Sequence, residues 1–198
     1  RHSSEGGGQV DAVSDLSGGI ANDKGLDGPA LLQWVREHGV VKGVPEGDEI
    51  DGAEVLTYNA DVLIPAALEN AVTAENVDDI KAEVVIEAAN GPVTPDAHDS
   101  LESRGVEVVP DILANAGGVT VSYFEWSQNI QQFRWPEQRV REELEIMMRK
   151  ACKDVTGVAG KYSLDRRTAA FVLAIKRVAR AAASRRTVDK HLPPRLLE

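Results

Sequence analysis

A single cysteine, Cys152, occurs in the sequence, so a disulfide within the chain is excluded. This scarcity is typical of proteins kept in a reducing compartment. No apolar run approaches the roughly 20 residues that a helix needs to cross a bilayer, and no signal-peptide pattern opens the sequence. We therefore expect a cytoplasmic protein that does not span a membrane.

Basic side chains are also scarce, because 22 Lys and Arg stand against 32 Asp and Glu, which gives a formal net charge of −10. Binding to a nucleic-acid backbone needs clustered Lys and Arg, so we expect no nucleic-acid partner. The four histidines lack the spacing of metal ligands, and no residues suggest a nucleophilic triad. We accordingly predict no metal site.

The chain has 198 residues, 42% of them hydrophobic, and is long enough to bury a substantial core. Up to residue 110, short apolar runs alternate with helical patterns, and the stretch 18–28 has the composition of a loop. Strands are expected at 9–14, 61–65, 83–88 and 107–109, and helices at 29–38, 73–80 and 95–105. Beyond residue 110, helices are expected at 112–133, 136–155 and 165–184. This order predicts an α/β fold with a parallel sheet.

Residues 111–126, DILANAGGVTVSYFEW, place two polar side chains, Asn115 and Ser122, in a small and apolar run. In a helix, Asn115, Val119 and Ser122 fall on one face, beside a backbone kept thin by two adjacent glycines. A ligand can approach such a face closely. The alternative is a core helix whose small residues pack tightly and whose Asn115 caps a turn.

This run resembles the C-terminal, nucleotide-binding domain of glutamate dehydrogenases, in the family that also includes leucine, phenylalanine and valine dehydrogenases. Three further blocks resemble it in the same order: AVSDLSGGIANDKGLD at 12–27, ADVLIPAALENAVTAENV at 60–77 and EAANGPVTPDA at 87–97. The resemblance covers roughly residues 10–180. It implies an incomplete doubly wound, Rossmann-like parallel sheet followed by long C-terminal helices. We therefore divide the chain into a flexible leader (1–8), a truncated NAD(P)-binding domain (9–133), C-terminal helices (134–186) and a tail (187–198).

The resemblance implies five cofactor-binding residues: Asp15, Ala66, Ala67, Asn90 and Asn115. A carboxylate at Asp15, after the first strand, suits the hydroxyls of a ribose, although an aspartate there also starts turns. The small side chains of the two alanines would let a dinucleotide pack against the backbone. Alternatively, they only allow the chain to change direction after the strand. The two asparagines are expected to hold the nicotinamide and its ribose, while the plainer role for Asn90 is a left-handed turn residue. The cofactor is NAD or NADP, and the sequence does not decide between them.

Ser122 resembles the serine that binds the side-chain carboxylate of glutamate in this family, with Val119 packing nearby. Glutamate or 2-oxoglutarate is therefore the expected substrate, and a relative acting on branched or aromatic amino acids is disfavoured by the AANGP and YFEW segments. The alternative for Ser122 is a bond to the carbonyl four residues earlier in its own helix.

Two parts of the family pattern are not found in the sequence. One is the strand, glycine-rich turn and helix that bind the pyrophosphate, since the glycines at 6–8 precede the strand at 9–14 and open no helix. The other is the domain that brings the catalytic lysines and aspartate, so we assign no catalytic residue and expect this chain alone to be inactive. Intact relatives are hexamers, and a homo-oligomer is expected. The alternative is a non-catalytic remnant acting as a weak nucleotide-binding or assembly module.

Overall fold

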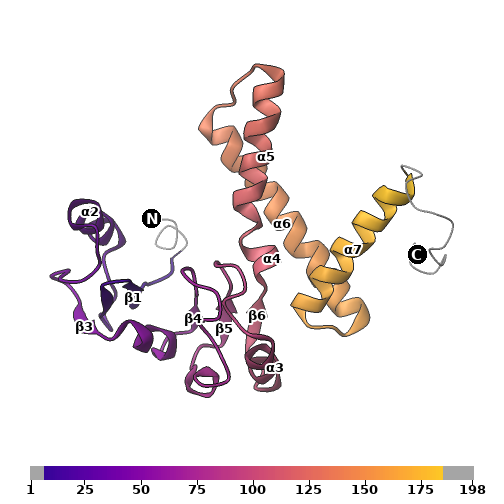
Figure 1. Ribbon diagram of the computed structural model, residues 1–198. Helices are drawn as coiled ribbons and strands as arrows, with labels where there is room; N and C mark the ends of the chain where they lie inside the picture. Colours follow the sequence, from indigo (N-terminus) through magenta and orange to yellow (C-terminus); the bar gives the residue numbers. More distant parts are fainter. Residues whose placement is uncertain (1–6, 185–198) are drawn as a thin grey trace. The chain divides into compact units, whose positions relative to one another are not determined.

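The structure, a computed structural model, describes residues 7–184 (Figure 1). Apart from Gly7 and Gly8, the predicted leader lies outside these residues, as does the predicted tail. Among the described residues two compact units are formed, one from 7–85 with 91–107 and the other from 86–90 with 108–184. The predicted division into 9–133 and 134–186 is a statement about functional domains and stays a prediction.

The first unit opens with an antiparallel sheet in the order β1-β2-β3. Its strands are β1 (Ala12–Asp15), β2 (Gly18–Ala21) and β3 (Asp48–Ile50). Ala12 pairs with Ala21 and Asp15 with Gly18, so a tight hairpin joins the first two strands. The first strand was expected in a parallel sheet and 18–28 as a loop. The first expectation is wrong, because β1 pairs antiparallel with the strand that directly follows it. The second is wrong for residues 18–21, which form β2, whereas residues 22–27 are a loop as expected.

Helix α2 (Gly28–His38) packs on this sheet. It begins where the Asp27 carboxylate accepts a hydrogen bond from the Ala30 amide at 3.0 Å, and it ends at Gly39 in the left-handed conformation (φ 79°). The predicted helix at 29–38 is confirmed. Its apolar side chains lie against a core of four buried residues, Ile20, Leu26, Val41 and Val44. A 3₁₀ segment, η1 (Gly52–Thr57), follows β3.

The second sheet has the order β4-β5-β6 and confirms the predicted parallel sheet. Its strands are β4 (Val62–Leu63), β5 (Val84–Ile86) and β6 (Glu107–Val109). The connections are the 3₁₀ segment η2 (Val77–Asp79), where a helix at 73–80 was expected, and α3 (Pro95–Ser103). Thr94 precedes α3 and Pro95 opens it, as expected from proline's fixed φ.

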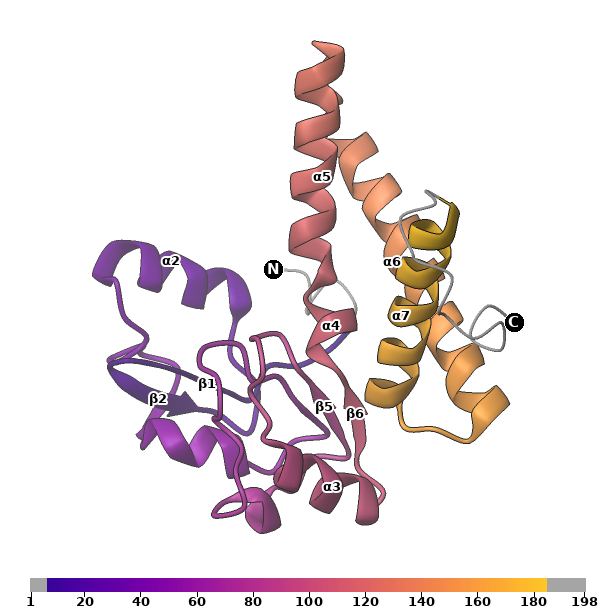
Figure 2. The ribbon, with the colours of Figure 1, turned by 45° about the vertical axis from the view of Figure 1, so that its right-hand side comes forward.

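The second unit is dominated by helices, shown from two sides in Figures 1 and 2. They are α4 (Asp111–Ala114), α5 (Ala116–Gln131), α6 (Glu137–Tyr162) and α7 (Arg166–Ser184). The predicted helix at 112–133 is therefore two helices, because the backbone leaves the helical range at Asn115 (φ −92°, ψ 0°). The predicted 136–155 helix is longer than expected and carries Cys152 exposed.

The core of this unit lies where α6 and α7 run side by side (Figure 2). Its buried members are Leu113, Val155, Ala169 and Ala170. The alanines let α7 approach closely, because a methyl group is the largest side chain that they interpose. None of the helices among residues 7–184 is both long and apolar enough to cross a membrane.

Candidate functional site

Asn90 and Asn115, 25 positions apart in the sequence, meet in the second unit. The Asn115 Nδ2 group donates a hydrogen bond to Asn90 Oδ1 at 2.6 Å and makes a longer one to the Ala89 carbonyl at 3.4 Å. Asn90 is exposed in the loop after β5, and Asn115 stands at the break between α4 and α5. The left-handed residue of this loop is Gly91 (φ 53°), so the turn role considered for Asn90 is wrong.

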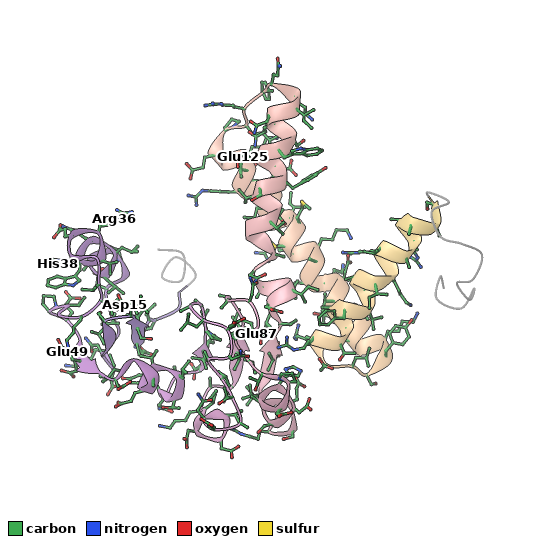
Figure 3. The ribbon with its side chains drawn as sticks, in the orientation of Figure 1. Asp15, Arg36, His38, Glu49, Glu87 and Glu125 are labelled. Atoms are coloured by element: carbon green, nitrogen blue, oxygen red, sulfur yellow. The ribbon has the colours of Figure 1, made fainter. Side chains whose placement is uncertain are left out.

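In the same unit, a buried ion pair connects the segment of Glu87 with α4 and α7. Glu87, which is labelled in Figure 3, is fully buried. Its Oε1 accepts from Arg167 Nη2 at 2.6 Å, and its Oε2 accepts from the Asp111 amide, the first of α4, at 2.8 Å. Arg167 Nη1 also lies 3.7 Å from Asp111 Oδ1. Both carboxylate oxygens of Glu87 are thus satisfied, as a buried charge requires.

Ser122 and Val119 lie on exposed turns of α5. The Ser122 hydroxyl donates to the Gly118 carbonyl at 3.2 Å, which is the bond within the helix that the sequence left open as the alternative. Val119 is 71% exposed. A methyl group added at Gly118 would meet no atom within 4 Å, so the backbone on this face of α5 is open to approach.

Asp15, labelled in Figure 3, lies at the end of β1 in the first unit. It is exposed, and both of its carboxylate oxygens accept hydrogen bonds. Its Oδ1 accepts from the Ser17 hydroxyl and from the Ser17 amide at 2.7 Å, and its Oδ2 accepts from the Val41 amide at 2.8 Å. The hydroxyl bond, and then the amide bonds, lower the pKa of the Asp15 carboxyl. The group is therefore a carboxylate at neutral pH, and its hydrogen bond with the Val41 amide connects the end of β1 to the loop that follows α2.

Ala66 and Ala67 lie on the exposed segment after β4, also in the first unit. Their methyl groups leave the backbone there accessible. Of the seven predicted site residues, the structure joins Asn90 and Asn115 directly. Val119 and Ser122 follow within the next two turns of the same helical run.

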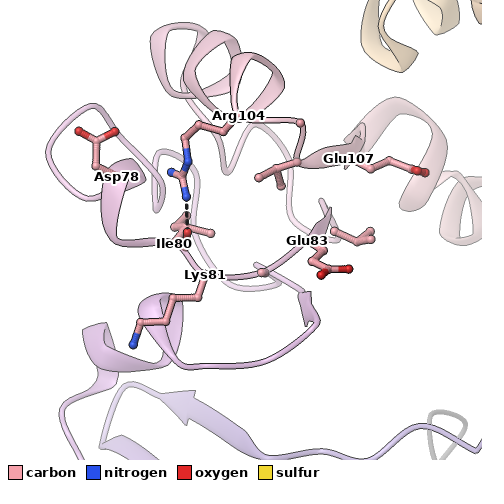
Figure 4. Close-up of a pocket in the computed structure, with 10 residues that line it drawn as sticks. Asp78, Ile80, Lys81, Glu83, Arg104 and Glu107 are labelled. Carbon is pink, nitrogen blue, oxygen red and sulfur yellow. Dashed lines mark hydrogen bonds between the residues drawn. The ribbon is translucent and has the colours of Figure 1, made fainter.

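The first unit also contains an open hollow of about 790 Å³ beside α3 (Figure 4). Charged side chains of both signs line it, including Asp78, Lys81 and Arg104. The Arg104 guanidinium, however, donates to the Val77 and Ile80 carbonyls and so closes η2 onto α3. None of the predicted site residues lies here, and residues 7–184 contain no group of three or more His, Cys, Asp or Glu that fits a metal ion.

Residues 1–186 match the family model for glutamate, leucine, phenylalanine and valine dehydrogenases. The chain belongs to this family. Glutamate dehydrogenase of Thermotoga maritima is 53% identical over 183 residues, 92% of this chain and 44% of that protein. NADP-specific glutamate dehydrogenase A1 of Halobacterium salinarum is 53% identical over 177 residues, 87% of this chain and 42% of that protein. The chain thus spans less than half the length of these relatives.

Solved structures of the family show the same fold. The hetero-hexameric glutamate dehydrogenase of Thermus thermophilus, in its leucine-bound form, superposes with a TM-score of 0.85 at 33% identity, over 93% of this chain and 43% of that one. Glutamate dehydrogenase of Peptoniphilus asaccharolyticus gives a TM-score of 0.76 at 36% identity, over 92% and 42%. The resemblance stated from four sequence blocks is confirmed.

Within the dehydrogenase family fold, sequence reasoning missed Glu87 and Arg167. In the sequence, Glu87 is the first residue of the EAANGP block, and Arg167 lies in the predicted helix at 165–184 with no feature that sets it apart. A signal existed for the first of them, since Glu87 directly follows the apolar strand VVI, where a charge is unusual. No comparable signal marked its partner, which lies 80 positions away.

Proposed function

We propose that the chain is the C-terminal, dinucleotide-binding part of an NAD- or NADP-dependent glutamate dehydrogenase. In that reaction a hydride passes from the α-carbon of glutamate to the nicotinamide, and water then converts the imine to 2-oxoglutarate and ammonia. The observation that carries the proposal is the pairing of Asn90 and Asn115 at 2.6 Å. Two amides that share one hydrogen bond keep one NH₂ group and one carbonyl for a ligand, which is the complement of a nicotinamide carboxamide.

The remaining cofactor contacts are assigned to the first unit. Asp15 accepts a ribose hydroxyl at the capacity left on Oδ2, because Oδ1 is occupied by two donors. Its negative charge disfavours a 2′-phosphate, although one acid alone does not exclude NADP. Ala66 and Ala67 offer exposed backbone against which the dinucleotide packs.

The substrate contacts are assigned to α5. The Ser122 hydroxyl rotates away from the Gly118 carbonyl, to which it makes a 3.2 Å bond, and donates to the side-chain carboxylate of glutamate. Val119, which is 71% exposed, packs against the methylene groups of the same substrate. Giving up a long bond within a helix to bind a charged carboxylate is favourable, because hydrogen bonds to charged groups are the stronger ones.

The general acid and base are assigned to the portion of the relatives that this chain does not span. Proton transfer by positioned groups contributes about 10²–10⁴ in rate, so the 198 residues alone are expected to bind cofactor without turning over glutamate. We place the assembled enzyme in the cytoplasm as a homo-oligomer. The Thermus thermophilus relative supports oligomerisation as such, but its hexamer contains more than one kind of chain.

Calorimetric titration with NAD, NADH, NADP and NADPH tests the cofactor assignment. Asn90→Ala and Asn115→Ala should each weaken binding about 10-fold, or about 1.4 kcal/mol. Asn129→Ala is the matched control, because Asn129 is an exposed asparagine further along α5. Equal effects of all three variants would contradict the assignment. Wild-type binding only in the millimolar range would favour the non-catalytic remnant instead.

A chimera tests the activity. In it, the part of the Thermotoga maritima relative that this chain does not span precedes residue 1, since the two proteins are 53% identical over the shared part. Glutamate-dependent formation of NADH or NADPH is expected, and Ser122→Ala should raise the KM for glutamate more than it lowers kcat. A folded chimera that binds dinucleotide yet shows no turnover would refute the proposal.

A further inference from the structure

Glu87 and Arg167 have no assigned role in binding, yet Glu87 is connected to both segments that carry the two asparagines. Glu87 precedes Asn90 by three residues in one loop. The Asp111 backbone amide donates a hydrogen bond to Glu87 at 2.8 Å, and Asp111 opens α4, at whose end Asn115 stands. The backbone N–H of Asn115 in turn donates a hydrogen bond to the Asp111 backbone carbonyl at 3.0 Å. A single buried carboxylate therefore touches both segments that carry the asparagine pair.

The carboxylate needs a counter-charge, and α7 supplies it. Arg167 Nη2 donates to Glu87 Oε1 at 2.6 Å, while Nη1 lies 3.7 Å from Asp111 Oδ1. The flat guanidinium thus spans two acids on two different elements, which a lysine ammonium cannot do with the same geometry. Glu87 is 0% exposed and the Arg167 side chain 22%, so solvent does little to screen the contact.

Stability alone is a weak reason for this arrangement. A buried ion pair is often no more stable than well-packed apolar residues of the same volume. The Arg167 Nε group is, in addition, buried without a hydrogen-bond partner among residues 7–184, which is unfavourable. The pair does supply a defined geometry within the second unit, because charged hydrogen bonds fix the Glu87 segment, α4 and α7 relative to one another within a narrow range.

We propose that Arg167 is a positioning residue of the dinucleotide site. Through Glu87 it sets the loop of Asn90 and the start of the helix that leads to Asn115, and so holds the two amides at bonding distance before the cofactor arrives. This inference rests on the proposed function of the asparagine pair. It predicts that a change on α7, in a residue that contacts no ligand, alters the amide pair and the affinity for dinucleotide together.

The experiment measures two properties of the full chain: the ¹⁵N–¹H resonances of the Asn90 and Asn115 side-chain amides without ligand, and the dissociation constants of NADH and NADPH. Arg167→Met should displace both amide resonances and weaken binding about 10-fold. Arg177→Met is the matched control, since Arg177 lies on the same helix and pairs with Asp154 at the same 2.6 Å. It should change neither property.

Arg167→Lys keeps the positive charge that Glu87 needs and covers the case in which Arg167→Met does not fold. It should displace the same two resonances and weaken binding several-fold, because the two-armed contact is lost. Unchanged resonances and affinity in a folded Arg167 variant overturn the inference, even if Asn90→Ala and Asn115→Ala abolish binding. If the Arg167 variants displace the two amide resonances but the wild-type chain binds no dinucleotide, the positioning of the amides is supported and the proposed function is refuted.

Discussion

The buried Glu87–Arg167 pair makes a strong prediction about stability. Replacing Arg167 with methionine keeps most of the apolar stem but leaves the Glu87 carboxylate buried without its counter-charge. Removing one partner of a buried ion pair destabilises proteins by about 3–5 kcal/mol. The Arg167 side chain is 22% exposed, which admits some water to the gap, so the lower end of that range, about 3 kcal/mol, is expected.

The double variant Glu87→Gln/Arg167→Met separates the charge from the packing. Glutamine is neutral and still accepts the Asp111 amide bond, which measures 2.8 Å in the wild type. No buried charge is left unpaired, so the double variant should lose less free energy of unfolding than Arg167→Met does. The resulting coupling between the two positions should be about 2 kcal/mol, within the range for residues in direct contact.

Urea unfolding followed by the helical circular dichroism signal measures both effects. With an m-value of about 2 kcal/mol/M, a loss of about 3 kcal/mol moves the midpoint by roughly 1.5 M. Arg177→Met serves as the control, because its ion pair with Asp154 is exposed on the helix surface and the midpoint should stay nearly unchanged. The reasoning fails if Arg167→Met shifts the midpoint no more than this control. It also fails if the double variant is less stable than Arg167→Met.

Three further predictions concern other parts of the chain. Gly118→Ala should raise the free energy of unfolding by about 0.5–1 kcal/mol, because its methyl group meets nothing within 4 Å, and should weaken dinucleotide binding if the ligand lies on this backbone. Unchanged affinity would remove Gly118 from the site. In an absorbance titration, Tyr58 should ionise last, because its bond to Asp23 raises its pKa from 10.0 to about 12, and Tyr162 first, because two lysines lower its pKa. The Tyr58 bond therefore stabilises the fold below pH 10 and is lost between pH 10 and 12, and Tyr58→Phe should remove the last step. Trp126→Ser should reduce self-association in sedimentation, since Trp126 is 58% exposed among apolar side chains of α5, and a wild type that stays monomeric at all concentrations would contradict this.

The parallel strands could be predicted from the sequence because each is a short apolar run between polar turns. Glu107–Val109 was predicted to the residue, and β4 and β5 fall inside the predicted ranges. The antiparallel sheet could not be predicted in the same way. β2 is the segment GGIA, which has one large apolar side chain, and β3 has only three residues, two of them acidic. Such strands are defined by the partner they pair with and not by their own pattern.

The candidate site shows a similar division. The resemblance assigned Asn90 and Asn115 to the same ligand, but their direct contact was not predicted, because they lie 25 positions apart. The predicted helix at 112–133 ran through Asn115 because the apolar period continues from α4 into α5; only the alternative, in which Asn115 caps a turn, pointed to the break. The Ser122 hydroxyl donates a hydrogen bond to the Gly118 carbonyl, four residues earlier. Any serine in a helix can form this bond, so it could be expected from the sequence as the alternative.

Two contacts of different kind hold α7 in the second unit. Ala169 and Ala170 are buried against α6 and Leu113 in an apolar core, and a contact made by such small side chains tolerates sliding by part of a turn. The charged hydrogen bond of Arg167, one turn closer to the start of the helix, does not tolerate it, because the 2.6 Å distance to Glu87 is lost with a shift of about 1 Å. The apolar contact thus supplies most of the attraction, while the ion pair selects one register of α7 against the segment of Glu87. Because the register is fixed in this way, a change on α7 is transmitted to the asparagine pair. A variant of α7 that lacks the Arg167 charge but is equally stable would not transmit it.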